Sequence, residues 1–320
     1  MSDPGAVGRL GSVSASGDPV PGRPARGWTI AEAWRGYATA LRLGWAIEAN
    51  WTDPLLFFTY SVAKPIAAAL ILVVMLDIVS GGGAPGYRAY LVTGTALWAF
   101  VQGGFSGLAM SVLEDRERYR MLKYLYVSPT AFAVSLLGRG TARIAIGGMG
   151  AVITLAFGVI ALGIRFDPAQ IDWPLLAVSM IVGLGAIVAF GLALAAVVLQ
   201  TRQESWSYPE ATAGAMFLLV GAIFPLAVLP GPVQVAGLAI PLTWWMEGVR
   251  RALFPDGVSG VGGPGSLWAM LTGSGAPDRL AILALLLVTT AAGTLAAAGA
   301  FAASERRAKD RGLIDQTTGS

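Results

Sequence analysis

The side chains best suited to chemistry or recognition in this sequence are concentrated in one dense run of charge. Seven of the ten residues from Glu114 to Lys123 are charged, in a chain with only 13% charged residues. Uncharged stretches border the run, Ala89–Leu113 before it and Ile144–Ile164 after it. Mixed charges of this density suit either docking to another protein or a solvated loop that fixes membrane topology. Composition alone leaves both open.

Catalytic and phosphate-binding chemistry have little support. The chain has no histidine and no cysteine, which removes the commonest general base and all thiolate ligands. Its lysines, Lys64, Lys123 and Lys309, are followed by Pro, Tyr and Asp, so none completes a G-x-x-x-x-G-K-[ST] phosphate loop. We therefore expect no catalytic residues, no metal and no cofactor in this chain.

A second polar group lies in "PLTWWMEGVRRAL" near the C-terminal third. Glu247 is either a polar group at an outer gate or a partner in a local salt bridge with the arginines that follow it. Trp244 and Trp245 are typical of the aromatic belt at a membrane interface. The candidate outer-gate residues are Pro241, Trp244, Glu247 and Arg250.

The elements that must position these residues are membrane spans, because 55% of the chain is hydrophobic and a span needs about 20 apolar residues. We predict an all-α polytopic membrane protein with a six-span domain at 30–304, between a disordered tail at 1–29 and a second tail at 305–320. The expected spans are about 57–80, 89–112, 132–164, 173–200, 211–229 and 280–303.

The fifth span is the hardest to delimit. No charge occurs over 211–246, which is too long for one span and too short for two with a turn. Four prolines fall in this stretch, and proline breaks helices. We predict a span that ends near Leu229 and an outer re-entrant segment at 231–250, covered by protein because it leaves backbone groups unpaired.

Charge predicts the orientation. With six crossings both termini share a side, and 17 of the 22 Lys and Arg residues then fall on that side, which is the cytoplasm. Ile30–Asn50 is amphipathic and predicts a helix on the cytoplasmic interface. The loop 113–130 is cytoplasmic too, and we expect a short helix in it. Its buried face would hold Leu113, Leu122, Leu125 and Tyr126, and its face in water would hold Glu114, Asp115, Glu117, Arg118 and Lys123.

Two stretches resemble the permeases of type-2 ABC transporters. One is "LEDRERYRMLKYLYVSPTAFAVSLLGR", with its charged run, Ser128-Pro129 and a Leu-Leu-Gly-Arg start to the next span. The other is "LLVGAIFPLAVLPGPVQVAGLAIPLTWWMEGVRRALF", with Pro225, an Ile-Pro-Leu-Thr turn and Glu-Gly-x-Arg. With the span pattern, the resemblance covers Ile30–Ser304. Tyr119-Arg120 stands where the family often has Gly-Thr, so this part of the loop departs from the family pattern.

The resemblance implies a permease subunit of an exporter in the cell membrane, in which two copies pair with two separate ATPase subunits. ATP and Mg²⁺ would bind the partner, and alternating access would follow ATP-driven closure. The residues implied to contact the ATPase are Glu114, Asp115, Arg116, Glu117, Arg118 and Tyr119. The homodimer and heterodimer stay open, and no nucleic acid partner is expected.

Few intramembrane charges favour a hydrophobic or amphipathic cargo, such as a drug-like molecule, a lipid or a lipid-linked glycan. The alternative is an ion-coupled secondary transporter, which usually carries mid-membrane acids and internal repeats. An intramembrane enzyme is a further alternative, but it would need a clustered catalytic set. The sequence shows no conspicuous mid-membrane acids, no internal repeats and no clustered catalytic set.

Overall fold

The computed structural model describes residues 29–50, 54–81, 85–127, 131–201 and 206–311, and within these ranges the chain is helical with no strand. Apart from Thr29, the expected N-terminal tail lies outside the described residues, as do residues 312–320 of the C-terminal tail. The elements are α1 (Ile30–Asn50), α2 (Pro54–Ser80), α3 (Pro85–Val101), η1 (Gln102–Ser106), α4 (Gly107–Leu113), η2 (Glu114–Arg118), α5 (Leu122–Val127), α6 (Phe132–Ala161), α7 (Trp173–Gln200), α8 (Ser207–Leu219), η3 (Leu226–Val228), α9 (Gly231–Ala239), α10 (Pro241–Leu253), α11 (Leu267–Thr272) and α12 (Arg279–Asp310).

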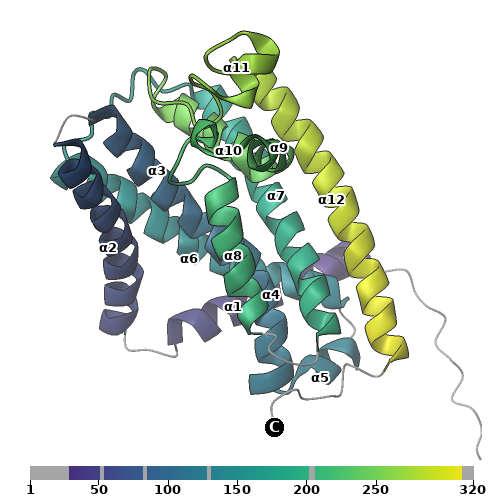
Figure 1. Cartoon of the computed structure of the whole chain (residues 1–320). Coiled ribbons are helices and arrows are strands. Elements are labelled where there is room, and N and C mark those ends of the chain that lie inside the picture. The colour runs from purple at the N-terminus through teal and green to yellow at the C-terminus, as the bar shows by residue number, and fades with distance from the viewer. Residues whose placement is uncertain (1–28, 51–53, 82–84, 128–130, 202–205, 312–320) are drawn as a thin grey trace, which may run out of the picture.

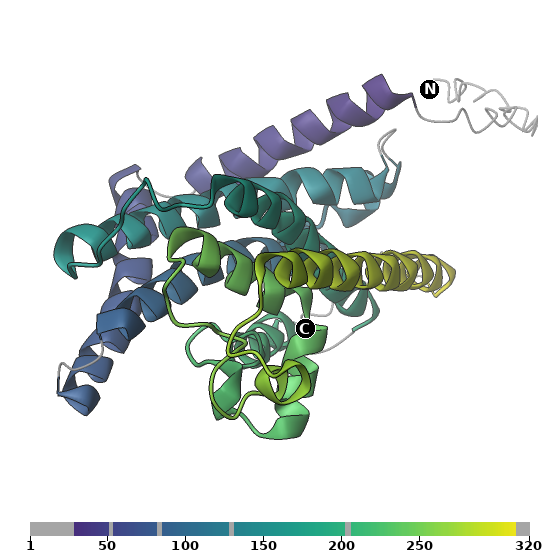
Figure 2. The same ribbon diagram turned by 90° about the horizontal axis from the view of Figure 1, so that it is seen from above.

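Five stretches in the described part are long and apolar enough to cross a membrane. They are Ala63–Ser80, Gly86–Arg118, Phe132–Ala161, Trp173–Gln200 and Arg279–Asp310. The stretch through α3 and α4 is the most enclosed, with 67% of its apolar window buried, against 11% for α2 and 17% for α12. Both views place α2 and α12 on opposite outer sides of the bundle (Figures 1 and 2). The core therefore lies around α3–α4 and α7.

Helix ends follow local chemistry. The carboxylates of Asp172 and Asp278 cap α7 and α12 by accepting hydrogen bonds from backbone N–H groups three residues on, both at 3.0 Å. Helix α6 ends at Ala161, three residues before the expected end of the third span, because Gly163 adopts a left-handed φ of 66°. Helix α12 continues to Asp310, beyond the expected start of the tail at residue 305.

Helix α1 crosses the lower end of the bundle in Figure 1, where α4 and α5 also end. A reciprocal pair of hydrogen bonds between Thr29 and Glu32 caps its start, and the bond from the Thr29 N–H lowers the pKa of the Glu32 carboxyl. The helix packs along α6, where the Tyr37 hydroxyl donates to Thr141 at 3.0 Å. A Cβ at Gly138 would lie 2.7 Å from the Tyr37 carbonyl, so only glycine permits this approach.

The fifth apolar stretch differs from the prediction of one continuous helix at 211–229. Helix α8 ends at Leu219 and, at 13 residues, is about 20 Å long, shorter than the roughly 30 Å hydrocarbon core. The chain turns where Gly221 takes a φ of 70°, and Pro225 precedes the short η3. The expected re-entrant segment 231–250 forms two helices, α9 and most of α10, at the upper end of the bundle (Figure 1).

The charged run also differs from the predicted separate loop helix. It forms η2, a π-helical turn that prolongs α4, so that the second apolar stretch is helical from Gly86 to Arg118. Arg120 then takes a left-handed φ of 50°, which ends the helix before the short α5. Leu113 and Leu122 are buried as predicted, whereas Leu125 is only partly buried and the side chain of Tyr126 lies outside the described part. Residues 128–130, at the expected end of the loop, lie outside the described residues.

Candidate functional site

The π turn η2 determines where the charged run points. The Tyr119 N–H donates to the Glu114 carbonyl, and the Met121 N–H to the Asp115 carbonyl, both at 2.8 Å. A π turn widens the helix by one residue per turn and is frequent at functional sites. In this turn the consecutive residues Glu114, Asp115 and Arg116 all reach neighbouring helices rather than water.

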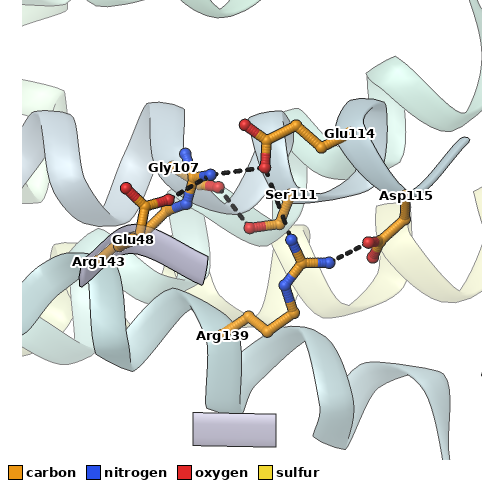
Figure 3. Close-up of polar contacts among 7 residues, drawn as sticks. All are labelled: Glu48, Gly107, Ser111, Glu114, Asp115, Arg139 and Arg143. Carbon is orange, nitrogen blue, oxygen red and sulfur yellow. Dashed lines mark hydrogen bonds and ion pairs between the residues drawn. The ribbon is translucent and has the colours of Figure 1, made fainter. Parts of the chain in front are cut away.

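Two of these side chains join an inner ion-pair cluster, which consists of Glu48, Glu114, Asp115, Arg139 and Arg143 (Figure 3). Arg139 donates to the Asp115 carboxylate and lies 3.6 Å from that of Glu114. Arg143 contacts Glu114 at 2.7 Å and Glu48 at 2.6 Å. The cluster therefore ties together α1, the end of the second apolar stretch and α6.

Arg116 connects the same turn to α7. Its guanidinium donates to the carbonyls of Val198 and Thr201 at 3.3 and 3.1 Å, at the lower end of that helix, and it pairs with Glu117 at 2.8 Å. The last carbonyls of a helix have no partner within the helix, and a cation near them is favourable. Arg116 is only 4% exposed, so this contact is part of the packed structure.

Only the end of the run faces outward. Arg118 and Arg120 are exposed, and Tyr119 is 39% exposed with the Arg118 guanidinium 5.6 Å from its ring centroid. We call Arg118, Tyr119 and Arg120 the basic tip. The expectation that Glu114, Asp115 and Glu117 stay in water is therefore wrong for Asp115, which is buried, and the other two are only partly exposed. Ion pairing with arginines of the same chain draws these acids inward.

The outer candidate residues surround the end of α8. Arg250 donates to the carbonyls of Gly221 and Ala222, both at 2.8 Å, and its guanidinium lies 3.7 Å from the ring centroid of Tyr90. The Tyr90 hydroxyl also donates to the Gly221 carbonyl, at 2.5 Å. These side chains satisfy the backbone carbonyls that the break in the helix leaves without partners, which hydrocarbon could not do. We call residues 220–225 the outer break.

Glu247 holds the loop that covers the outer break. Its carboxylate accepts hydrogen bonds from the Ser259 hydroxyl at 2.5 Å and the Gly260 N–H at 2.6 Å, and the Gly260 carbonyl accepts from the Leu226 N–H at 2.7 Å. Among the ion pairs of the described residues, none joins Glu247 to Arg250. Of the two alternatives for Glu247, the local salt bridge is replaced by hydrogen bonds, and both charges lie beside Gly260.

The other two outer candidates, Pro241 and Trp244, are buried in the packing around α10. Pro241 begins α10 and is buried. Trp244 is 2% exposed and donates from its indole N–H to the Leu238 carbonyl at 2.7 Å, and Trp245 is completely buried. The predicted interfacial belt is therefore wrong, because Trp245 packs against Gly183 of α7 and Phe100 of α3, and Trp244 packs against Trp268 of α11.

Sequence reasoning missed the residues that hold the charged run in place. Arg139 and Arg143 lie four residues apart in an apolar span, so they share one face of α6. That spacing was the available signal, since cations inside a span face partners or water. Tyr90 gave no such signal. In the part of the chain that the structure covers, no three His, Cys, Asp or Glu side chains gather to hold a metal ion.

The comparison with protein families agrees with this architecture. The model of the family described as "ABC-2 family transporter protein" matches residues 61–300, which include the inner ion-pair cluster except Glu48, the basic tip and the outer break. No curated protein matches the chain. Since the family model spans three quarters of the sequence, this chain, with its apolar helices suited to a multi-pass membrane location, belongs to the ABC-2 family of transporter proteins, whose members are membrane transport components and not themselves catalytic.

Proposed function

We propose that this chain is the permease subunit of an ATP-driven exporter and that its basic tip docks on a separate ATPase subunit. The observation that carries the proposal is the division of the charged run. Its acids Glu114 and Asp115 form ion pairs with arginines of the same chain, while the basic tip is exposed. A tip with two arginines and an exposed aromatic ring suits an acidic groove on a protein partner.

The same contacts offer a route for motion. Arg116 binds the turn η2 to α7, and the inner ion-pair cluster binds it to α6 and α1. A push on the basic tip would therefore move several helix ends together instead of bending a loop. Two copies of the chain, rearranged in this way when ATP closes the ATPase pair, would give alternating access. ATP and Mg²⁺ would remain on the partner.

We further propose six crossings with both termini in the cytoplasm. Helix α8 rises from the lower end beside α4 to the upper end beside α9 (Figure 1), and the outer break and α9 complete its passage. It contacts the second apolar stretch, where the Ser106 hydroxyl donates to the Pro209 carbonyl and the rings of Phe217 and Trp98 lie tilted with their centroids 4.8 Å apart. Helix α1 would lie at the cytoplasmic interface, and α9 and α10 in the outer leaflet. The apolar spans favour a hydrophobic or amphipathic cargo.

Reversing the charge of the basic tip should release the ATPase. We expect the amount of ATPase that is captured with the double variant Arg118→Glu, Arg120→Glu to fall by about tenfold or more relative to the wild-type chain. Like charges that face each other across an interface cost several kcal/mol. The measurement is pull-down of the tagged chain from its native membrane, with the captured ATPase identified by its Walker motifs. The purified chain alone should hydrolyse no ATP.

The matched control is Arg165→Glu, an exposed arginine beyond the opposite end of α6. It should retain the ATPase fully. Equal retention by the tip variant and the control would contradict the docking role of the basic tip. ATP hydrolysis by the pure chain would contradict the separate ATPase.

The proposed topology can be tested with single cysteines, because the chain contains none. Met270 and Tyr124 are 77% and 67% exposed at the upper and lower ends. In intact cells, a membrane-impermeant maleimide should label Met270→Cys and reach Tyr124→Cys only after permeabilisation. Labelling of both from the same side would show that α8 does not complete a crossing.

A further inference from the structure

We propose that a pocket between α2, the second apolar stretch and α6 binds the phosphate headgroup of an anionic lipid from the inner leaflet. The pocket has a volume of about 370 Å³. Ligand pockets typically measure about 300–1,000 Å³, so this one accommodates a headgroup and the first part of its chains. The assignment to the inner leaflet rests on the proposed orientation, which places α1 and the lower ends of α2 and α6 towards the cytoplasm.

The charged side chains that line the pocket are one acid and two cations, namely Glu48, Arg143 and Lys64. Arg143 is already matched by Glu48 and Glu114, at 2.6 and 2.7 Å. Lys64 also lines the pocket, is exposed, and makes no hydrogen bond or ion pair within the described residues. A cation within a span normally has a partner. A lipid phosphate would supply a partner for Lys64.

The walls divide into a polar and an apolar part, as an amphipathic ligand requires. The lower, polar part combines Lys64 with the amide of Gln102 and the hydroxyl of Ser106. The apolar part has the larger side chains of Met110 and Ile146 and several small residues that leave space for an acyl chain: Pro65, Ala68, Ala99, Gly147 and Gly150. Ala68 is exposed, so the pocket is open towards the outer side of the bundle, where lipid would enter.

The backbone next to the pocket is irregular in the same place. The π turn η1, Gln102–Ser106, interrupts the second apolar stretch where it borders the pocket, and it places both Gln102 and Ser106 in the lining. Insertions of this kind occur often at functional sites. The competing explanation is that Lys64 extends to the interface for solvation alone. The two explanations differ in whether lipid binding depends on this lysine.

The test measures lipid binding by the purified full chain with native mass spectrometry, using phosphatidylglycerol, phosphatidylcholine and inorganic phosphate. We expect preference for phosphatidylglycerol and a loss of about fivefold in its affinity for Lys64→Gln, the contribution of one lysine to an anionic lipid surface. Lys309→Gln makes the same change on an exposed lysine at the far end of α12 and should have no effect.

A second pair of variants tests the apolar part without touching charge. Ala68→Trp should block phosphatidylglycerol, whereas Ala67→Trp, on an exposed neighbour outside the lining, should not. Unchanged binding by both Lys64→Gln and Ala68→Trp would overturn the proposal. So would inorganic phosphate competing as strongly as the lipid, which would assign the site to a free anion. The assay needs no ATPase, so its failure is distinct from failure of the proposed transport function.

Discussion

Replacing Arg139 with leucine should cost the folded chain about 3–5 kcal/mol, the range found when one partner of a buried ion pair is removed. Arg139 and the Asp115 carboxylate that it contacts are 3% and 1% exposed, so the variant leaves a buried negative charge alone. Glu114 also loses a cation at 3.6 Å. We expect a large loss of folded protein, measured by size-exclusion chromatography of detergent extracts over a temperature series.

The double variant Asp115→Asn, Arg139→Gln is the rescue. It removes both charges and keeps side chains that can hydrogen-bond, so it should recover most of the stability, because replacing a whole buried pair costs far less than breaking it. Arg118→Leu makes the single change on an exposed arginine and should shift stability by less than about 0.5 kcal/mol. An Arg139→Leu chain as stable as Arg118→Leu would contradict the role of the inner ion-pair cluster.

Hydropathy predicted the long helices well because the tendency of a segment to span a membrane depends on its own length and apolarity. The stretches at 173–200 and around 280–303 are uncharged and long, and each begins after an aspartate that caps it. Their lengths and order follow from the thickness of the hydrocarbon core. The ends of other helices were predicted less well. Helix α6 stops early because Gly163 takes a left-handed conformation, and α12 continues to Asp310, past the predicted end of the last span.

The direction of the charged side chains could not be read from hydropathy. An ordinary helical period divides Glu114, Asp115 and Arg116 between a wet and a dry face, whereas the π turn brings all three against neighbouring helices. Arginines from α6 and carbonyls at the end of α7 then hold them. These partners are distant in sequence, so a solvated helix was the natural expectation for the segment alone.

The outer break was missed for a similar reason. The prolines in 211–246 indicated a break near Leu229, with Pro225 kept inside the predicted span, but they did not show that the helix would end at Leu219. That point depends on Arg250 and Tyr90, which supply donors to Gly221 and Ala222 from two other helices. The sequence predicted which residues are polar at this end but not which backbone groups they satisfy.

Replacing Arg250 with methionine should open the outer break while leaving the lower end intact. Methionine fills a similar volume but donates no hydrogen bond. The Ala222 carbonyl loses its side-chain donor, at about 1–3 kcal/mol for a buried unsatisfied group, while Gly221 keeps the Tyr90 hydroxyl. The buried Glu247 carboxylate also loses a positive charge that lies near it, beside Gly260. We expect transport to fall at least about tenfold and ATPase retention to remain at the wild-type level.

Accessibility of the break distinguishes this outcome from general unfolding. Ala222 is completely buried, so Ala222→Cys should resist a maleimide in the wild-type background and react when combined with Arg250→Met. Arg250→Lys should be intermediate, because an ammonium keeps the charge but lacks the planar pair of donors that reaches two carbonyls at once. Arg251→Met removes the neighbouring arginine, which donates to the Pro255 carbonyl and not to the break, and should leave Ala222→Cys protected. If Arg250→Met left both Ala222→Cys labelling and transport unchanged, Arg250 would not hold the outer break, and the helix would have to end at Leu219 through the left-handed Gly221 alone.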